Sequence, residues 1–213
     1  MENRKKVIRA SGNKNIRIKV IPGHFATNHS HVNYYVDLTS LKCTYRSAKA
    51  AAAELAKRFG PTTPVDTIIC LEGTQVIGAY LAEELARPGN FGMSEGNDIN
   101  VLEPETNSNN QMLFRDNMQE MVWNKNVLLL ISSASTGKTV LRSLDCLQYY
   151  NGRLVGVGAL FSATPEVAGH RIESIFTADD LPGYENSLSG QCSMCRDKKK
   201  VDAIVNSFGY SKI

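Results

Sequence analysis

The residues best suited to chemistry form a loop of small and hydroxyl-bearing side chains that follows the apolar run VLLLI (127–131). The loop consists of Ser135, Thr136, Gly137, Lys138 and Thr139. Small residues let successive backbone N–H groups converge on an anion, and the hydroxyl and ammonium groups offer further donors. A helix that starts here would direct its positive end at the same point. The pattern predicts a phosphate site, with a Ser/Gly turn that only caps a helix as the alternative.

A nucleoside triphosphatase loop fits these residues poorly. Its pattern, G-x-x-x-x-G-K-[ST], requires a glycine five residues before Gly137, where this chain has Ser132. A serine adopts the backbone turn of that glycine less readily. The sequence also shows no convincing apolar strand that ends in an aspartate for magnesium. We therefore expect a different kind of phosphate loop.

A second turn of interest, Glu72-Gly73-Thr74, follows the apolar stretch from Thr67 to Leu71. Like the first loop, it stands between a predicted strand and a predicted helix. Ligands of open α/β sheets bind at the carboxyl ends of the strands. We therefore expect the two loops to lie at one edge of the sheet and to share a ligand.

The elements around these loops alternate between strands and helices. Predicted strands cover 15–20, 31–38, 67–71, 99–103, 127–131, 154–163 and 171–177. Predicted helices cover 45–60, 74–87, 139–150 and, at the end of the chain, 192–210, while 112–124 is a short helix or a hairpin arm. This order predicts an α/β fold with an open, mainly parallel sheet flanked by helices.

The composition indicates an ordinary globular protein. Apolar residues make up 42% of the 213 residues, and a net charge of +3 is too small to indicate a nucleic-acid surface. The apolar runs fall far short of the ~18 residues that span a bilayer, and the basic N-terminus has no apolar signal core. Five cysteines, an odd number, fit reduced thiols better than a disulfide framework. We expect a cytoplasmic protein that binds neither nucleic acid nor a membrane.

Two groups of residues raise the question of a metal. Cys192 and Cys195 have the C-x-x-C spacing of half a zinc site, but a second pair would have to come from a dimer partner or from His170. An ordinary reduced pair is the simpler interpretation, so zinc is not expected. The loop after the first strand carries three histidines, His24, His29 and His31. They could form a metal or acid–base cluster, but solvated loop side chains are favoured.

The stretch 127–140 resembles the phosphoribosyl pyrophosphate loop of the type I phosphoribosyltransferases. That pattern is four apolar residues, two acids, two variable residues and T-T-G-G-T, and residues 135–139 align with the last part, which grips the ribose 5-phosphate. The N-terminal region resembles the hood of orotate phosphoribosyltransferases, with Gly23, Phe25 and Tyr35 matching. Residues 65–85 resemble the family's first strand, pyrophosphate loop and helix, and the ending CSMC is similar to some family tails.

The resemblance implies one phosphoribosyltransferase-like domain, with hood strands in 1–45, an α/β core in 46–180 and a tail in 181–213. It implies a homodimer that binds phosphoribosyl pyrophosphate or a nucleoside 5′-monophosphate. The implied activity is transfer of ribose 5-phosphate between pyrophosphate and a nucleobase, in nucleotide metabolism. The implied site has Glu72, Gly73 and Thr74 as the pyrophosphate loop and Phe25 and Asn28 on the base side, and it admits magnesium.

The sequence departs from the family at the two acids, which align with Ile131 and Ser132. In the family these carboxylates bind the ribose hydroxyl groups, and one helps to stabilise the cationic sugar. Serine can bind a hydroxyl group but carries no charge to offset the developing cation. Losing both acids is expected to lower the rate at least about a hundredfold. The catalytic residues therefore stay unassigned.

Further departures concern the charges around the ligand. Segment 104–117 replaces a basic mobile loop and has Arg115 as its only cation, and Asn28 replaces a lysine that usually contacts orotate. Glu72 would repel pyrophosphate unless a metal intervened, although a solvated turn residue is an equal alternative. Two functions stay open: a transferase with displaced acids, and a non-catalytic sensor of a phosphoribosyl ligand.

Overall fold

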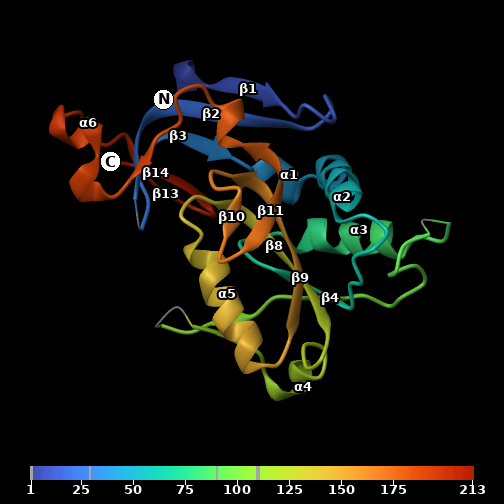
Figure 1. Cartoon of the computed structure of the whole chain (residues 1–213). Coiled ribbons are helices and arrows are strands. Elements are labelled where there is room, and N and C mark those ends of the chain that lie inside the picture. Colours follow the sequence, from blue (N-terminus) through green and yellow to red (C-terminus); the bar gives the residue numbers. More distant parts are fainter. Residues whose placement is uncertain (1, 29, 90, 109–110) are drawn as a thin grey trace.

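The computed structural model describes residues 2–28, 30–89, 91–108 and 111–213. Its central sheet has the strand order β10-β11-β9-β8-β4-β5 (Figure 1). The strands are β4 (Thr67–Cys70), β5 (Asn100–Leu102), β8 (Asn126–Ala134), β9 (Arg153–Ser162), β10 (Glu166–Val167) and β11 (His170–Thr177). All neighbours are parallel except the short edge strand β10, which pairs antiparallel with β11. The predicted open, mainly parallel sheet is confirmed.

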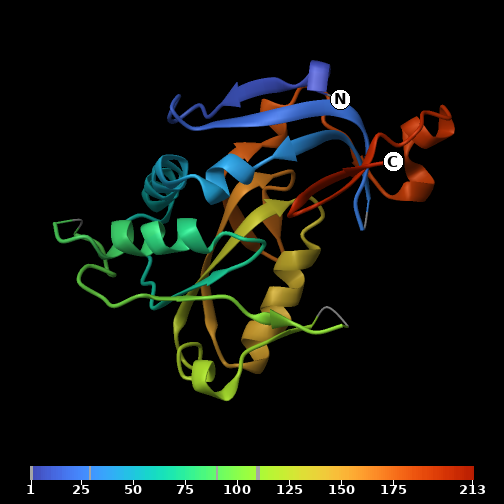
Figure 2. The same ribbon diagram turned by 180° about the vertical axis from the view of Figure 1, so that it is seen from behind.

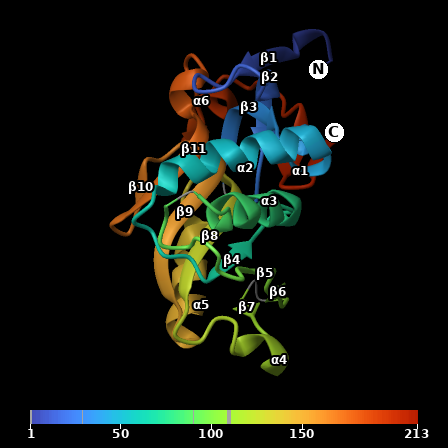
Figure 3. The same cartoon turned by 90° about the vertical axis from the view of Figure 1, so that its right-hand side faces the viewer.

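Helices cover both faces of this sheet because its central strand is apolar on both sides. The helices are α1 (Thr39–Cys43), α2 (Tyr45–Phe59), α3 (Gln75–Ala86) and α5 (Lys138–Tyr149). Leu128 and Leu130 of β8 belong to the core that α2 and α3 cover, whereas Leu129 and Ile131 pack with α5. Figure 3 shows α2 and α3 together on one side of the molecule. Helix α2 ends as predicted, with Gly60 beyond its last residue at a φ of 60°.

A second sheet forms the hood, and both ends of the chain contribute to it. Its strand order is β12-β3-β2-β13-β14, and β1 pairs with β2 in addition. Figure 2 shows the blue N-terminal strands meeting the red C-terminal hairpin. The strands are β1 (Lys6–Arg9), β2 (Arg17–Ala26), β3 (His31–Asp37), β12 (Asn186–Ser187), β13 (Ala203–Asn206) and β14 (Gly209–Lys212). The hood is therefore built from the N-terminal strands together with the tail.

The prediction of one helix over 192–210 is wrong. The structure has a single helical turn there, α6 (Ser193–Arg196), followed by the hairpin of β13 and β14. Residues of β13 alternate between buried and exposed, which is the period of a strand on one face of a sheet. Its pairing partner β2 lies about 180 residues away in the sequence, so the local pattern could not supply it.

The remaining elements are short. They are the 3-10 helices Glu2–Arg4, Ala178–Asp180 and Ser189–Gln191, the strands β6 (Glu105–Thr106) and β7 (Met112–Leu113), and the helix α4 (Asp116–Gln119). β6 and β7 pair antiparallel, so the excursion before β8 combines the predicted hairpin arm with a short helix. Among the described helices, none has the length and apolar character required to cross a bilayer.

Candidate functional site

The cleft of interest lies where the strand order of the central sheet reverses direction. β4 comes first in the chain, and the sheet continues from it to β5 on one side and to β8 on the other. In open α/β sheets the crevice at such a point, beyond the carboxyl ends of the strands, is where ligands bind. A cavity of about 490 Å³ opens there, between the sheet edge and the hood. The two loops that follow β4 and β8 both contribute to its lining, with Glu72 and Gly73 from the first. Thr74, predicted with them, is instead buried and donates to the carbonyl groups of Leu71 and Leu130.

The loop after β8 turns into α5 through a glycine in the left-handed conformation. Gly137 has a φ of 72° and immediately precedes α5, and a Cβ atom there would lie 3.1 Å from Cγ1 of Val167 and closer still to Cγ2. Only glycine fits both the conformation and the space. Among the described residues, no side chain caps the first turn of α5, so its leading N–H groups are not bound by a capping side chain.

All five predicted phosphate-binding residues line the cavity. They are Ser135, Thr136, Gly137, Lys138 and Thr139. Arg142, one turn further along α5 than Lys138, also lines it, so two cations stand beside the uncapped helix end. This arrangement combines backbone donors, hydroxyl groups, positive charge and a helix dipole, which is the chemistry that binds a phosphate group.

Two residues of the C-terminal segment form hydrogen bonds with this loop. The Asn186 amide donates to the Ser135 carbonyl at 3.2 Å, and the Tyr184 hydroxyl is hydrogen-bonded to the Ser135 side chain. Burial raises the pKa of Tyr184, so its hydroxyl stays protonated at neutral pH. The loop is therefore held on two sides before any ligand arrives.

Glu72 brings a carboxylate to the end of β8. It has a φ of 59°, and its Oε2 accepts the Ser133 backbone N–H at 3.1 Å. A further hydrogen bond comes from the side chain of Thr139, one of the residues predicted to bind phosphate. Burial raises the pKa of Glu72, against the opposing effects of these hydrogen bonds and of Lys42. Glu72 is thus part of the site, and not the solvated turn residue that the sequence left as an equal alternative.

Lys42 binds the backbone of the Glu72 turn, and it is a site residue that no sequence motif singled out. The residue is 8% exposed, and its Nζ donates to the carbonyl groups of Glu72 at 3.0 Å and Ser207 at 2.5 Å. Burial lowers the pKa of Lys42, an effect that Glu72 partly opposes. Lys42 therefore ties the Glu72 turn to the tail. Its position in a short helix, α1, carries no local signal of this role.

The two positions of the missing family acids are buried in the strand. Ile131 is fully buried in the core beneath α5, and Ser132 is 2% exposed. The carboxylates of the described chain that line the cavity come from other strands, Glu72 after β4 and Glu103 after β5. Glu103 is hydrogen-bonded to the Gln75 amide. Carboxylate oxygens are the ligands that Mg²⁺ prefers, so magnesium at these two residues stays a prediction.

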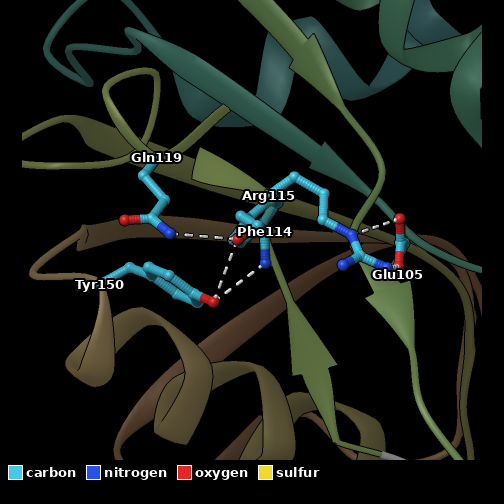
Figure 4. Close-up of polar contacts among 5 residues, drawn as sticks. All are labelled: Glu105, Phe114, Arg115, Gln119 and Tyr150. Carbon is cyan, nitrogen blue, oxygen red and sulfur yellow. Dashed lines mark hydrogen bonds and ion pairs between the residues drawn. The ribbon is translucent and has the colours of Figure 1, made fainter. Parts of the chain in front are cut away.

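The excursion 104–117 keeps its cation away from the cleft. Arg115 forms a two-pronged ion pair with Glu105, with Nε to Oε1 at 3.0 Å and Nη2 to Oε2 at 2.6 Å (Figure 4). This pairing raises the pKa of Arg115 and lowers that of Glu105. The Tyr150 hydroxyl bonds both the N–H and the carbonyl of Phe114, which fixes the arm on α5. In this arrangement the guanidinium group is already neutralised.

Of the two residues predicted on the base side, only one lines the cavity in the part of the chain that the structure describes. Asn28 lines the cavity at the hood, whereas Phe25 is fully buried in the hood core against Tyr35. The prediction for Phe25 is therefore wrong, because its position on β2 directs it into the sheet interface. Tyr34 and Phe208 line the cavity instead, and Phe208 is 88% exposed on the turn between β13 and β14.

The histidines and cysteines that the sequence presented separately meet at the far side of the hood. His24, His31, Cys192 and Cys195 place their ligand atoms within 4.8 Å of one another. His24 is 3% exposed, so the prediction of a solvated loop side chain is wrong for it. His170 begins β11 and is not part of this group, and His29 lies outside the described residues.

Comparisons with solved structures identify the fold. No protein-family model matches the sequence, and no curated protein matches it significantly in sequence. Among solved structures, the chain is similar to a phosphoribosyltransferase from Corynebacterium diphtheriae, with a TM-score of 0.53 and 18% identity over 76% of this chain and 90% of that one. Adenine phosphoribosyltransferase from Thermoanaerobacter pseudethanolicus has a TM-score of 0.51 and 14% identity over 83% and 96% of the two chains.

A third similar structure is orotate phosphoribosyltransferase from Mycobacterium tuberculosis H37Rv in complex with inorganic phosphate. Its TM-score is 0.50, with 18% identity over 71% of this chain and 83% of that one. These likenesses confirm the fold that the sequence motifs predicted. At such identities they carry over neither substrate nor activity.

Proposed function

We propose that this chain, which has the type I phosphoribosyltransferase fold, binds phosphoribosyl pyrophosphate or a nucleoside 5′-monophosphate in the cleft at the strand ends. The observation that carries the proposal is the uncapped start of α5, with the cup 135–139 and the cations Lys138 and Arg142 around it. An anion is the group that these donors are suited to hold. That a similar orotate phosphoribosyltransferase was solved with inorganic phosphate agrees with this proposal.

The cleft also has groups suited to the rest of such a ligand. With the 5′-phosphate in the cup 135–139, the ribose would lie beside the end of β8. The carboxylate of Glu72, which follows the neighbouring strand β4, reaches this place and binds the Ser133 N–H. Tyr34, Asn28 and Phe208 line the hood side, where a base could stack on an aromatic ring and bond an amide. Asn28 is neutral, so a base without a negative charge suits this side better than orotate.

We favour transfer of ribose 5-phosphate over binding alone, because Glu72 restores a carboxylate near the position of the missing acids. As pyrophosphate leaves C1 of the ribose, positive charge develops on the sugar, and a nearby carboxylate stabilises it. Glu72 and Glu103 would hold Mg²⁺, which would neutralise the leaving pyrophosphate. A ring nitrogen of the base then forms the new bond to C1, and the chain's own part is to orient the ribose and balance its charge.

A non-catalytic sensor is the second candidate, and the charges of the cleft favour it. Arg115 is neutralised by Glu105, and segment 104–117 has no other cation to place on a pyrophosphate. A 5′-monophosphate would meet the cations at α5 and would bring no pyrophosphate group to the two carboxylates. Such a protein would bind a nucleotide and would not turn it over.

Two measurements on the purified chain test the proposal and separate its two forms. Ribose 5-phosphate, phosphoribosyl pyrophosphate and nucleoside 5′-monophosphates should raise the melting temperature, while ribose should not. At a hundred times the dissociation constant the stabilisation is about 2.7 kcal/mol, or roughly 5–11 °C for a chain of this size. Pyrophosphate release with magnesium and a panel of bases then identifies a transferase.

Variants assign the binding to the cup. Thr136→Ala and Lys138→Ala should each reduce the thermal shift from ribose 5-phosphate, whereas Thr62→Ala, an exposed threonine away from the cleft, should not. Stabilisation without turnover leaves the sensor. If no phosphorylated ligand shifts the melting temperature more than ribose does, both forms of the proposal are wrong.

A further inference from the structure

Four side chains with the chemistry of zinc ligands converge at the edge of the hood. His24 lies on β2, His31 begins β3, Cys192 precedes α6 and Cys195 lies in α6. His24 Nε2 is 2.9 Å from His31 Nδ1 and 3.6 and 3.7 Å from the sulfur atoms of Cys192 and Cys195. The Cys195 sulfur is 3.3 Å from His31 Nδ1. All four atoms therefore surround one point.

The nitrogen–sulfur separations agree with a tetrahedral zinc ion at that point, whereas the 2.9 Å between the two imidazole nitrogens would have to lengthen when zinc binds. Zinc bonds of about 2.05 Å to nitrogen and 2.3 Å to sulfur place two nitrogen ligands roughly 3.4 Å apart, and a nitrogen and a sulfur roughly 3.5 Å apart. The nitrogen–sulfur distances of 3.3, 3.6 and 3.7 Å bracket the second value. Two imidazoles and two thiolates are a ligand set typical of structural zinc sites, which leave no position open.

The groups behind these ligands suit a metal as well. His24 Nδ1 is 2.9 Å from the Lys199 carbonyl, so a proton on Nδ1 leaves the Nε2 lone pair directed at the cluster. Cys192 and Cys195 would bind the ion as thiolates, the form of cysteine that binds a metal.

The segment that carries the two cysteines has little else to hold it in place. Between Leu188 and Lys200, Cys192 is the one buried residue among the described side chains, and 196–200 is charged and exposed. A segment with so little apolar burial gains little from the hydrophobic effect. It nevertheless leads directly into β13, which pairs with β2 from Phe25 onward, immediately after His24.

We propose that His24, His31, Cys192 and Cys195 bind one zinc ion that fastens the C-terminal segment to the hood strands. The bound ion sets the start of β13, and β13 carries Asn206, Ser207 and Phe208 to the cleft. The carbonyl group of Ser207 also accepts a hydrogen bond from the ammonium group of Lys42, which binds the Glu72 carbonyl as well. The ion therefore has a structural role at a distance from the ligand cleft, and it orders one of the cleft walls.

Metal analysis of the full chain, purified under reducing conditions with Zn²⁺ and without a chelator, tests this site. Mass spectrometry of the elements should find about one zinc per chain. Co²⁺ in place of Zn²⁺ should give the visible absorption of a tetrahedral ion together with a thiolate charge-transfer band. The cobalt spectrum needs no variant, so it does not depend on whether a substituted chain folds.

Variants then assign the ligands. Cys195→Ser and His31→Ala should each weaken zinc binding by more than about a hundredfold, since changes in groups behind the ligands alone cost 10–100-fold. Cys43→Ser and His170→Ala replace the same residue types outside the cluster and should keep one zinc per chain. A chelator should lower the melting temperature of the original chain and of these controls, but not that of the ligand variants.

Three results would overturn the proposal. One is a zinc content below about 0.1 per chain after reconstitution. Another is equal zinc loss in the ligand variants and the controls. The third is a disulfide between Cys192 and Cys195 in the reduced preparation. Zinc content is independent of nucleotide binding, so failure here leaves the proposed function standing.

Discussion

The shape of the phosphate cup can be tested by adding one methyl group at Gly137. In a Gly137→Ala variant the new Cβ must adopt the left-handed backbone conformation at a φ of 72°. It must also share space with the γ-methyl groups of Val167, at 3.1 Å from one and closer to the other. Valine is branched at Cβ and stiff about χ1, so it cannot easily turn away.

Two terms determine the expected loss of stability. The left-handed conformation costs a residue with a Cβ roughly 1–2 kcal/mol, and overpacking costs about 1–3 kcal/mol. Together they predict a fall of about 2–5 kcal/mol in the free energy of unfolding. Alanine also lowers the entropy of the unfolded chain, which offsets about 0.4–1 kcal/mol of this.

Gly169 provides a matched control, because it has a φ of 80° and no atom within 4 Å of a Cβ placed there. Gly169→Ala should show the conformational cost of roughly 1–2 kcal/mol without the clash. Urea denaturation of both variants, with the midpoint and the slope recorded, separates the two terms. Adding Val167→Ala to Gly137→Ala should recover part of the difference, measured as a coupling energy in a double-mutant cycle.

Ligand binding is the second measurement on this variant. A loop displaced by Val167 should lose most of the thermal stabilisation by ribose 5-phosphate, and the double variant should regain part of it. Equal denaturation midpoints for Gly137→Ala and Gly169→Ala, with ribose 5-phosphate binding intact, would refute the loop geometry described above.

Three further predictions concern the groups around the cup. Burial raises the pKa of Glu72 in the folded chain, so its ionisation costs folding free energy that is absent below the unfolded pKa of about 4.3, grows as the pH rises towards the folded pKa and is constant above it. Relative to the original chain, Glu72→Gln should therefore gain stability between pH 4 and pH 8 in urea titrations. Glu105→Gln should free Arg115 and tighten binding of phosphoribosyl pyrophosphate, but not of a 5′-monophosphate, by calorimetry. Tyr150→Phe should lower the free energy of unfolding by about 1 kcal/mol, because the Phe114 N–H loses its acceptor.

Each of these has a result that would count against it. A stability difference between Glu72→Gln and the original chain that stays constant with pH would mean that Glu72 titrates normally. Equal gains for the diphosphate and monophosphate ligands would show that Arg115 does not reach a pyrophosphate. Tyr149→Phe, at a side chain that is 79% exposed, should leave the urea midpoint unchanged, and an equal loss there would contradict the role of Tyr150.

The elements that carry their own local pattern could be predicted. β8 is a continuous apolar run because both of its faces are covered, and α2 combines good helix formers with Gly60 at its end. The loop 135–139 is recognisable because small residues between a buried strand and a helix have few other uses. The joint position of the two Gly-containing loops also follows from the parallel order, since the carboxyl ends of parallel strands meet at one edge.

The C-terminal tail shows where prediction from the local sequence pattern fails. Residues 192–210 were expected to form one helix, but β13 forms there because β2 offers it an open edge far away in the sequence. The same pairing brings Phe208 to the cleft while Phe25, which matches the family hood, turns into the core. The environment of a side chain in a sheet depends on its partners, and those are set by tertiary contacts.

By itself the sequence determined the fold class and the loss of the family acids, and it predicted the phosphate loop, since each is written in adjacent residues. Tertiary structure alone decided that Glu72 reaches Ser133 from the neighbouring strand, that Lys42 binds its backbone carbonyl, and that two histidines meet two cysteines. Those groups are separated by 30 to 171 residues along the chain. Residues that far apart meet only when strand order and packing are complete, so spacing along the chain cannot reveal them.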